Sequence, residues 1–194
     1  GERVDGHDFV AGVASQGATV AIVERHVDAP IAQVVVADTI AGLTGVARGV
    51  VSAARTRGLS VIGVTGSSGK TSTKDLIAQV LAPAGPTIAP VGSFNNEIGL
   101  PLTACRVAAD TQFLVSEMGA RGLGHVAFLC TITPPSIGAV LNVGHAHLGE
   151  FGSQQVIAQA KGELVEALDA EGWAVLNADD PLVAAMASRT PARV

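Results

Sequence analysis

Aromatic residues are scarce in this chain of 194 residues: they make up 3% of it, and tyrosine is absent. Proteins that bind single-stranded nucleic acid stack the bases on aromatic side chains. Lysine and arginine number 12 against 17 acidic residues, and they form no cluster of the kind that a phosphate backbone requires. The sequence therefore argues against DNA or RNA as a partner.

The sequence also lacks a long apolar run. No segment approaches the roughly 20 residues that cross a membrane, and the N-terminus has no basic-then-apolar signal layout. Cys105 and Cys130 lie in apolar stretches without the spacing of metal ligands, so we expect them to be reduced and buried. These features predict no membrane insertion and a cytoplasmic location.

Hydrophobic residues make up 48% of the chain, and with so few aromatics the core has to be built from Ala, Val, Ile and Leu, which fill α/β sandwiches. Short apolar runs alternate with segments of helical periodicity. Strands are expected at 18–23, 33–36, 60–65, 113–116, 137–141 and 173–176, and helices at 39–57, 70–81, 98–106 and 156–168. The predicted fold is α/β, with a mostly parallel sheet and flanking helices.

The same pattern divides the chain into two parts. Residues 1–58 are expected to form a small N-terminal α/β unit, and residues 59–194 a central domain of the P-loop type. The chain opens without an initiator Met in the turn-like polar segment 1–9, which suggests a fragment of a longer protein.

A glycine-rich loop lies where a strand should give way to a helix, in Gly66-Ser67-Ser68-Gly69-Lys70-Thr71-Ser72. Backbone amides of such a loop converge on phosphate oxygens, the lysine neutralises the terminal phosphates, and the threonine hydroxyl binds Mg²⁺. The strict pattern requires glycine at position 64 and finds Val64. Because a strand precedes the loop and a helix follows it, we predict binding of a nucleoside triphosphate with Mg²⁺.

Polar residues follow the other predicted strands, where ligands bind in open α/β sheets. They are Glu117, Asn142, Asn177 and Asp179. Glu117 is either a ligand of Mg²⁺ or an ordinary solvated acid. His145 and His147 are either metal ligands or exposed loop histidines.

Lysine is rare, with only Lys70, Lys74 and Lys161 present against nine arginines. Lys161 lies on a predicted helix that is otherwise apolar on one side. A compact amine there can be chemically modified, which a guanidinium cannot, although an ordinary surface lysine is the alternative.

Taken together, these residues resemble the Mur ligases, the ATP-dependent enzymes that add amino acids to the peptidoglycan precursor. The resemblance runs nearly end to end, and its segments follow the family's order. These are Thr-Gly-Ser-Ser-Gly-Lys-Thr at 65–71, Asn-Asn-Glu-Ile-Gly-Leu-Pro at 95–101, Glu-Met-Gly-Ala at 117–120, His-Leu-Gly-Glu-Phe-Gly-Ser at 147–153 and Ala-Lys-Gly-Glu at 160–163. The segment at 95–99 resembles the member that adds D-alanyl-D-alanine.

The resemblance implies a role for each matched position. Lys70 and the loop amides would bind the ATP phosphates, Thr71 and Glu117 a first Mg²⁺, and His147 a second. Lys161 matches the family's carbamylated lysine, whose carbamate offers carboxylate-like oxygen ligands. Asn95 and Asn96 would lie near the precursor.

The implied reaction joins D-alanyl-D-alanine to UDP-N-acetylmuramoyl-tripeptide (UDP-MurNAc-tripeptide). The terminal carboxylate of the tripeptide attacks the γ-phosphate of ATP, and the amine of D-Ala-D-Ala then displaces the acyl phosphate through a tetrahedral intermediate. Lys70 and two Mg²⁺ ions would offset the charge that builds on the transferring oxygens.

The family has three domains, and the resemblance covers part of the first, which carries the UDP end of the precursor, and part of the second. The C-terminal domain is absent, so we expect the chain by itself to be inactive. Two other functions stay open: a P-loop module that binds nucleotide without catalysis, and another ligase of the superfamily, such as a folylpolyglutamate synthetase.

Overall fold

A computed structural model describes residues 4–144 and 152–194, and these divide into two compact units, Gly1–Gly45 and Val46–Val194. The division falls inside one helix, α2 (Thr39–Arg55), whereas the domain boundary predicted from the sequence follows that helix. The assignment of 1–58 and 59–194 to functional domains stays a prediction.

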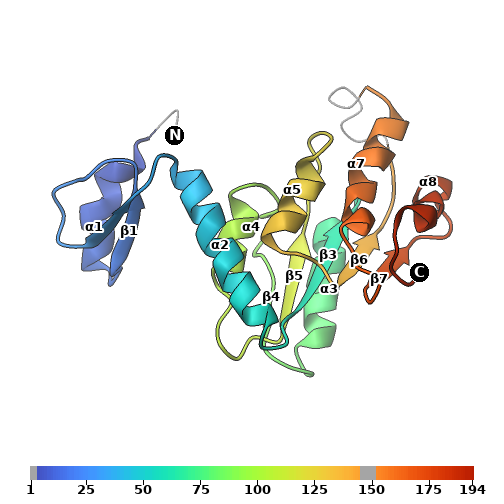
Figure 1. The fold of residues 1–194 in the computed structure, drawn as a ribbon, viewed down its shortest axis with the longest axis horizontal. Helices are drawn as coiled ribbons and strands as arrows, with labels where there is room; N and C mark the ends of the chain where they lie inside the picture. Colours follow the sequence, from blue (N-terminus) through green and yellow to red (C-terminus); the bar gives the residue numbers. More distant parts are fainter. Residues whose placement is uncertain (1–3, 145–151) are drawn as a thin grey trace. The chain divides into compact units, whose positions relative to one another are not determined.

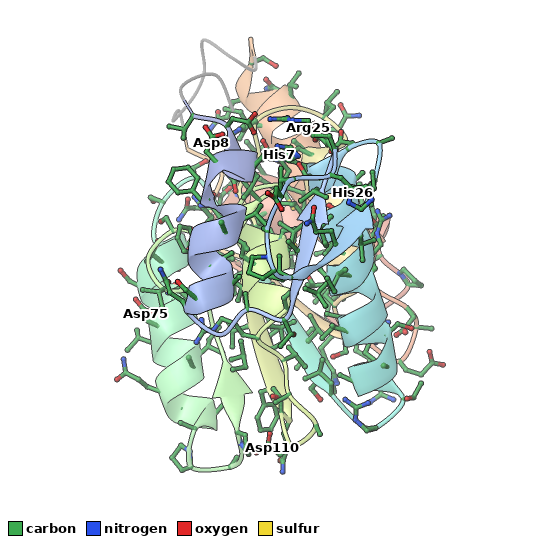
Figure 2. The ribbon with its side chains drawn as sticks, turned by 90° about the vertical axis from the view of Figure 1, so that its left-hand side faces the viewer. His7, Asp8, Arg25, His26, Asp75 and Asp110 are labelled. Carbon is green, nitrogen blue, oxygen red and sulfur yellow. The ribbon has the colours of Figure 1, made fainter. Side chains whose placement is uncertain are left out.

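The first unit contains a short parallel sheet of β1 (Val20–Val23) and β2 (Ala32–Val35). A 3-10 turn, η1 (Gly6–Phe9), and α1 (Val10–Ser15) precede it. Asp5 caps the turn by accepting a hydrogen bond from the His7 amide. His7 in turn accepts from the amide of Glu24, and its ring lies beside the Arg25 guanidinium (Figure 2).

The second unit is built on a five-stranded sheet in the order β4-β5-β3-β6-β7, and every pairing in it is parallel. The strands lie side by side in Figure 1. They are β3 (Ser60–Thr65), β4 (Thr87–Ile88), β5 (Phe113–Glu117), β6 (Ile137–Val140) and β7 (Trp173–Leu176). The predicted α/β class and parallel sheet are confirmed.

Helices cover both faces of this sheet, as parallel strands require. On one face, Ile62 and Val64 of β3 pack with Ile77 and Leu81 of α3 (Lys70–Leu81). On the other face, Val61 belongs to a larger core with residues of α2 and of four further helices. These are α4 (Gly99–Ala104), α5 (His125–Ile132), α7 (Gln154–Glu166) and α8 (Pro181–Ala184). A final 3-10 turn, η2 (Ala185–Arg189), follows α8.

Four elements of the second unit, β4, α5, α8 and η2, are missing from the sequence-based prediction. The segment His-Val-Ala-Phe-Leu-Cys-Thr-Ile of α5 is apolar on nearly every side, and its Val126, Leu129 and Ile132 are fully buried. A short helix of this kind has no polar face, so periodicity cannot distinguish it from a buried strand. None of the helices in the described ranges is long and apolar enough to cross a membrane.

The carboxyl ends of the parallel strands meet at one edge of the sheet, and the segments that follow β3, β5 and β6 lie there. At the opposite edge, Figure 2 shows Asp110 in the turn that leads into β5. The predicted site residues that the structure describes therefore have to be sought at the carboxyl edge.

Candidate functional site

The glycine-rich loop joins β3 directly to α3, as the sequence predicts. Gly69 ends the loop with a φ of +80°, in the left-handed region that favours glycine, and no side chain caps the helix after it. Gly66 is also required, because a Cβ atom there would lie 2.9 Å from Cβ of Leu141. The first amides of α3 are thus left without a side-chain acceptor, which suits an anion.

Lys70 begins α3 and bends back over the loop. Its Nζ donates a hydrogen bond of 2.8 Å to the carbonyl oxygen of Gly66. The ammonium group is thereby held across the loop, where a bound phosphate would meet both it and the backbone amides.

Asn142, which follows β6, holds the loop from the side. Its Oδ1 accepts hydrogen bonds from the amides of Ser67 and Ser68, each at 3.0 Å, and its Nδ2 donates to the Ser68 carbonyl at 3.1 Å. The sequence places Asn142 at this edge but gives it no role. Its position after the strand that pairs with β3 was the feature of the sequence that could have indicated a contact with the loop.

Two residues after β7 brace the segment around Asn142. Nδ2 of Asn177 donates to the carbonyl of Leu141 at 2.9 Å, and Oδ2 of Asp180 accepts from the amide of Val143 at 2.7 Å. The backbone is therefore fixed on both sides of Asn142.

Glu117, the last residue of β5, is fully buried and makes contacts with both carboxylate oxygens. Oε2 accepts from the Thr71 hydroxyl at 3.0 Å, and Oε1 accepts from Nδ2 of Asn95 at 2.8 Å. Ser93 lies 2.8 Å from the Thr71 hydroxyl. The alternative of a solvated strand-end acid is thus wrong for Glu117, because no part of its side chain reaches solvent.

Lys161 lies on α7 with only 5% of its surface exposed, so it is not an ordinary surface lysine. Burial, followed by repulsion from Lys70, lowers the pKa of its amine to about 8. A lowered pKa means that more of this amine is neutral near neutral pH than in an ordinary lysine. A neutral amine is the form that can react with carbon dioxide.

One pocket of about 240 Å³ lies between the loop and Lys161, and Thr71, Glu117 and Asn142 are not among the residues that line it. Of the predicted site residues, it is lined by Gly66, Ser67, Lys70, Asn95 and Lys161. Gly119, Ala120, Arg121 and His125 line it as well, and the sequence singled out none of them as a site residue. A larger hollow of about 550 Å³, near Arg48 and Arg55, contains no predicted site residue.

The other predicted site residues are placed differently. Asn96 lies just before α4, where its Oδ1 accepts hydrogen bonds from the amides of Ile98 and Gly99. Ser72 is exposed on α3. His147 and His145 lie outside the described residues.

A second hollow, of about 360 Å³, borders the other side of the loop at Ser68 and Gly69. Leu141, Val175 and Asn177 line it, so its walls combine apolar side chains with an amide. Those walls would suit a nucleoside base next to bound phosphates.

The donor atoms can be compared with what Mg²⁺ prefers. The Thr71 hydroxyl and the Glu117 carboxylate are oxygen ligands 3.0 Å apart, and they fit one Mg²⁺ ion. An unmodified Lys161 amine is not a ligand for Mg²⁺, so a second ion would require its conversion to a carbamate. Within residues 4–144 and 152–194, no three His, Cys, Asp or Glu side chains gather as a metal site.

Comparison with known families bears on this site directly. A family model described as the Mur ligase middle domain matches residues 64–194, which include the loop, Glu117 and Lys161. The chain belongs to the Mur ligase family.

Similar proteins narrow the position of this Mur ligase chain within the family. UDP-N-acetylmuramoyl-tripeptide–D-alanyl-D-alanine ligase of Mycobacterium tuberculosis is 50% identical over 213 residues, covering 100% of this chain and 42% of the relative. A crystal structure of MurF from Acinetobacter baumannii matches with a TM-score of 0.87 at 38% identity, over 100% of this chain and 42% of the other.

A third comparison concerns nucleotide. The MurF ligase of Thermotoga maritima, solved in complex with ADP, matches this Mur ligase chain with a TM-score of 0.82 at 33% identity, over 99% of this chain and 44% of the other. The chain thus spans about two fifths of the length of these relatives, and what the relatives do as whole proteins is a matter for proposal.

Proposed function

We propose that the protein carrying this chain is an ATP-dependent ligase that joins D-alanyl-D-alanine to UDP-MurNAc-tripeptide in cytoplasmic peptidoglycan precursor synthesis. The convergence of the phosphate loop, the Thr71–Glu117 pair and the buried Lys161 around one edge of the sheet carries the proposal. The substrates come from the names of relatives that are up to 50% identical over the whole chain.

In this proposal the loop binds the triphosphate of ATP. The uncapped amides at the start of α3 and the Lys70 ammonium would offset the negative charge of the phosphates. The base would lie in the apolar hollow on the far side of the loop, beside Asn177. Asn142 would keep the loop rigid, which keeps donor and acceptor in line.

Thr71 and Glu117 would hold one Mg²⁺, and the ion would supply positive charge at the phosphates. A carbamate on Lys161, with His147, would hold a second ion. Lys161 is suited to that modification because its amine is buried and its pKa is lowered. Asn95 and Asn96 are proposed to lie near the precursor.

The proposed chemistry has two steps. The carboxylate of the tripeptide attacks the γ-phosphate of ATP, so that an acyl phosphate forms and ADP leaves. The amine of D-Ala-D-Ala then attacks the acyl carbon, the amide bond forms, and phosphate leaves. Residues 1–58 are proposed to belong to the domain that carries the UDP end of the precursor, and residues 59–194 to the ATP-binding domain.

The test is ligation by the full-length protein with ATP, Mg²⁺ and UDP-MurNAc-tripeptide, comparing D-Ala-D-Ala with free diaminopimelate and free lysine. We expect only D-Ala-D-Ala to stimulate phosphate release. If no amine does so while ATP still binds, the protein is a nucleotide-binding module, and the ligase proposal is wrong. Stimulation by another amine would indicate a different ligase of the superfamily.

A further inference from the structure

Arg121 gives the pocket of the phosphate loop a second strongly basic group besides Lys70. It lies in the segment between β5 and α5, and 63% of its side chain is exposed. Among the described residues that line this pocket none is acidic. The pocket is therefore suited to a ligand with more than one negative charge.

Glu97 fixes the position of Arg121 from outside the pocket. Its Oε1 accepts a hydrogen bond of 3.2 Å from Nη1 of Arg121. The backbone amide of Glu97, and then the charges of Arg121 and His125, lower the pKa of this carboxyl. Because one nitrogen of the guanidinium is anchored in this way, the other nitrogens can bind a ligand with less loss of side-chain entropy.

His125 completes this arrangement. Its Nδ1 accepts a hydrogen bond of 3.2 Å from the backbone amide of Arg121, and its Nε2 lies 3.3 Å from Oε2 of Glu97. His125 therefore contacts both the backbone of Arg121 and the carboxylate that anchors its side chain, and it is a positioning residue for Arg121.

We propose that Arg121 binds a side-chain carboxylate of the acyl-donor peptide, and so selects acidic peptides. This inference rests on the proposed function. The name of a related structure from Acinetobacter baumannii gives that protein's peptide as alanyl-D-glutamyl-2,6-diaminopimelate, whose last two residues carry carboxylates beyond those in peptide bonds. A planar guanidinium matches a carboxylate with two parallel hydrogen bonds.

The triphosphate is a less suitable partner for Arg121. The loop already presents free amides and the Lys70 ammonium to phosphate, all from the β3–α3 connection. Arg121 comes from a different connection, together with Gly119 and Ala120. An acyl donor has to reach the γ-phosphate from outside the loop, and the β5–α5 segment forms a wall on which it can lie.

The experiment measures steady-state ligation by the full-length protein and by its Arg121→Ala, Arg121→Lys and Arg57→Ala variants. Arg57→Ala is the matched control, since it removes an exposed arginine near the opposite edge of the sheet. Each enzyme is given the natural donor and donors with one side-chain carboxylate converted to an amide. Binding of the donor without ATP is measured by calorimetry.

We expect Arg121→Ala to weaken donor binding and to lower kcat/KM for the donor about 10- to 100-fold, as for the loss of a charged hydrogen-bond pair. The KM for ATP should change less than about twofold. The kcat/KM of Arg121→Lys for the donor should lie between those of the wild-type protein and Arg121→Ala. Amidation of the bound carboxylate should reduce the activity of the wild-type protein as much as Arg121→Ala does, but should not reduce the activity of Arg121→Ala any further.

Three results would overturn the inference: an unchanged KM for the donor, a rise in the KM for ATP alone, or full additivity of the amidation and the variant for every carboxylate. If the wild-type protein binds the donor through Arg121 but ligates no amine, the proposed function fails while the recognition of the carboxylate stands. A wild-type protein that binds no donor would refute both.

Discussion

At the scale of single residues, the buried amine of Lys161 is costly to the fold. Its folded-state pKa of about 8 lies below the ordinary 10.5, so folding disfavours the ammonium form. That cost is fully present below about pH 8 and disappears as the pH rises towards 10.5, where the unfolded chain also loses the proton. The residue is therefore kept for a reason other than stability.

We expect Lys161→Met to raise the free energy of unfolding by roughly 1–3 kcal/mol at pH 7, or a few degrees in Tm, and to do so much less at pH 9.5. Denaturant unfolding in buffer purged of carbon dioxide measures this difference. The same variant should abolish ligation by the full-length protein. A loss of stability at pH 7 would contradict the account of Lys161 as a buried and unfavourable cation.

Asn142 is the second single residue whose chemistry can be tested. Asn142→Asp keeps an acceptor for the Ser67 and Ser68 amides but adds a negative charge beside the phosphates and removes the donor to Ser68. The dissociation constant for ATP should rise about tenfold or more, with little loss of stability. Titration with a fluorescent ATP analogue measures this, against Gln112→Glu as a control, which adds a charge at an exposed position just before β5. Unchanged affinity of Asn142→Asp would exclude Asn142 from the nucleotide site.

At the scale of elements, α5 and α7 are tied together by Glu163. Its Oε1 accepts from the amide of Gly124 at 2.6 Å, and its Oε2 from the amide of Ala127 at 2.9 Å. A carboxylate at the N-terminus of a helix satisfies free amides and interacts favourably with the helix dipole. Because Lys161 lies on α7 and His125 opens α5, this contact also sets two walls of the pocket.

Glu163→Ala should therefore lower the free energy of unfolding by about 1–2 kcal/mol, and Glu163→Gln by less, since the amide keeps one acceptor. Glu171→Ala serves as the control, because it removes an exposed acid outside any helix. Thermal unfolding followed by circular dichroism distinguishes the three. Equal midpoints for Glu163→Ala and Glu171→Ala would show that the cap contributes nothing.

The elements also show what the sequence could and could not predict. The bounds of β3 and α3 were predictable, because an apolar run, a glycine loop and the stop at Pro83 mark them locally. The cluster of Glu97, Arg121 and His125 was not, because it exists only once α4 and α5 pack beside β5. Asn142 was predicted in part: the sequence placed it at the correct edge of the sheet but did not predict its contact with the loop.

At the scale of the whole molecule, the chain spans only about two fifths of the length of its relatives. It nevertheless contains a nearly complete phosphate site. The loop, Asn142, Glu117 and the apolar hollow all lie within the unit Val46–Val194. Binding of nucleotide thus depends on contacts inside one compact unit, whereas ligation also needs the donor and the amine to be held in place.

We accordingly expect this 194-residue chain to bind ADP and ATP but not to ligate. Calorimetry should detect nucleotide, and Lys70→Ala should weaken that binding at least tenfold, because the residue that neutralises the phosphates is lost. A coupled assay of ADP release, with D-Ala-D-Ala and UDP-MurNAc-tripeptide present, should show no turnover by this chain. The full-length protein, assayed in parallel, should turn over. Normal turnover by the chain would mean that everything ligation requires lies within these 194 residues, and absence of nucleotide binding would mean that the loop depends on contacts beyond its own unit.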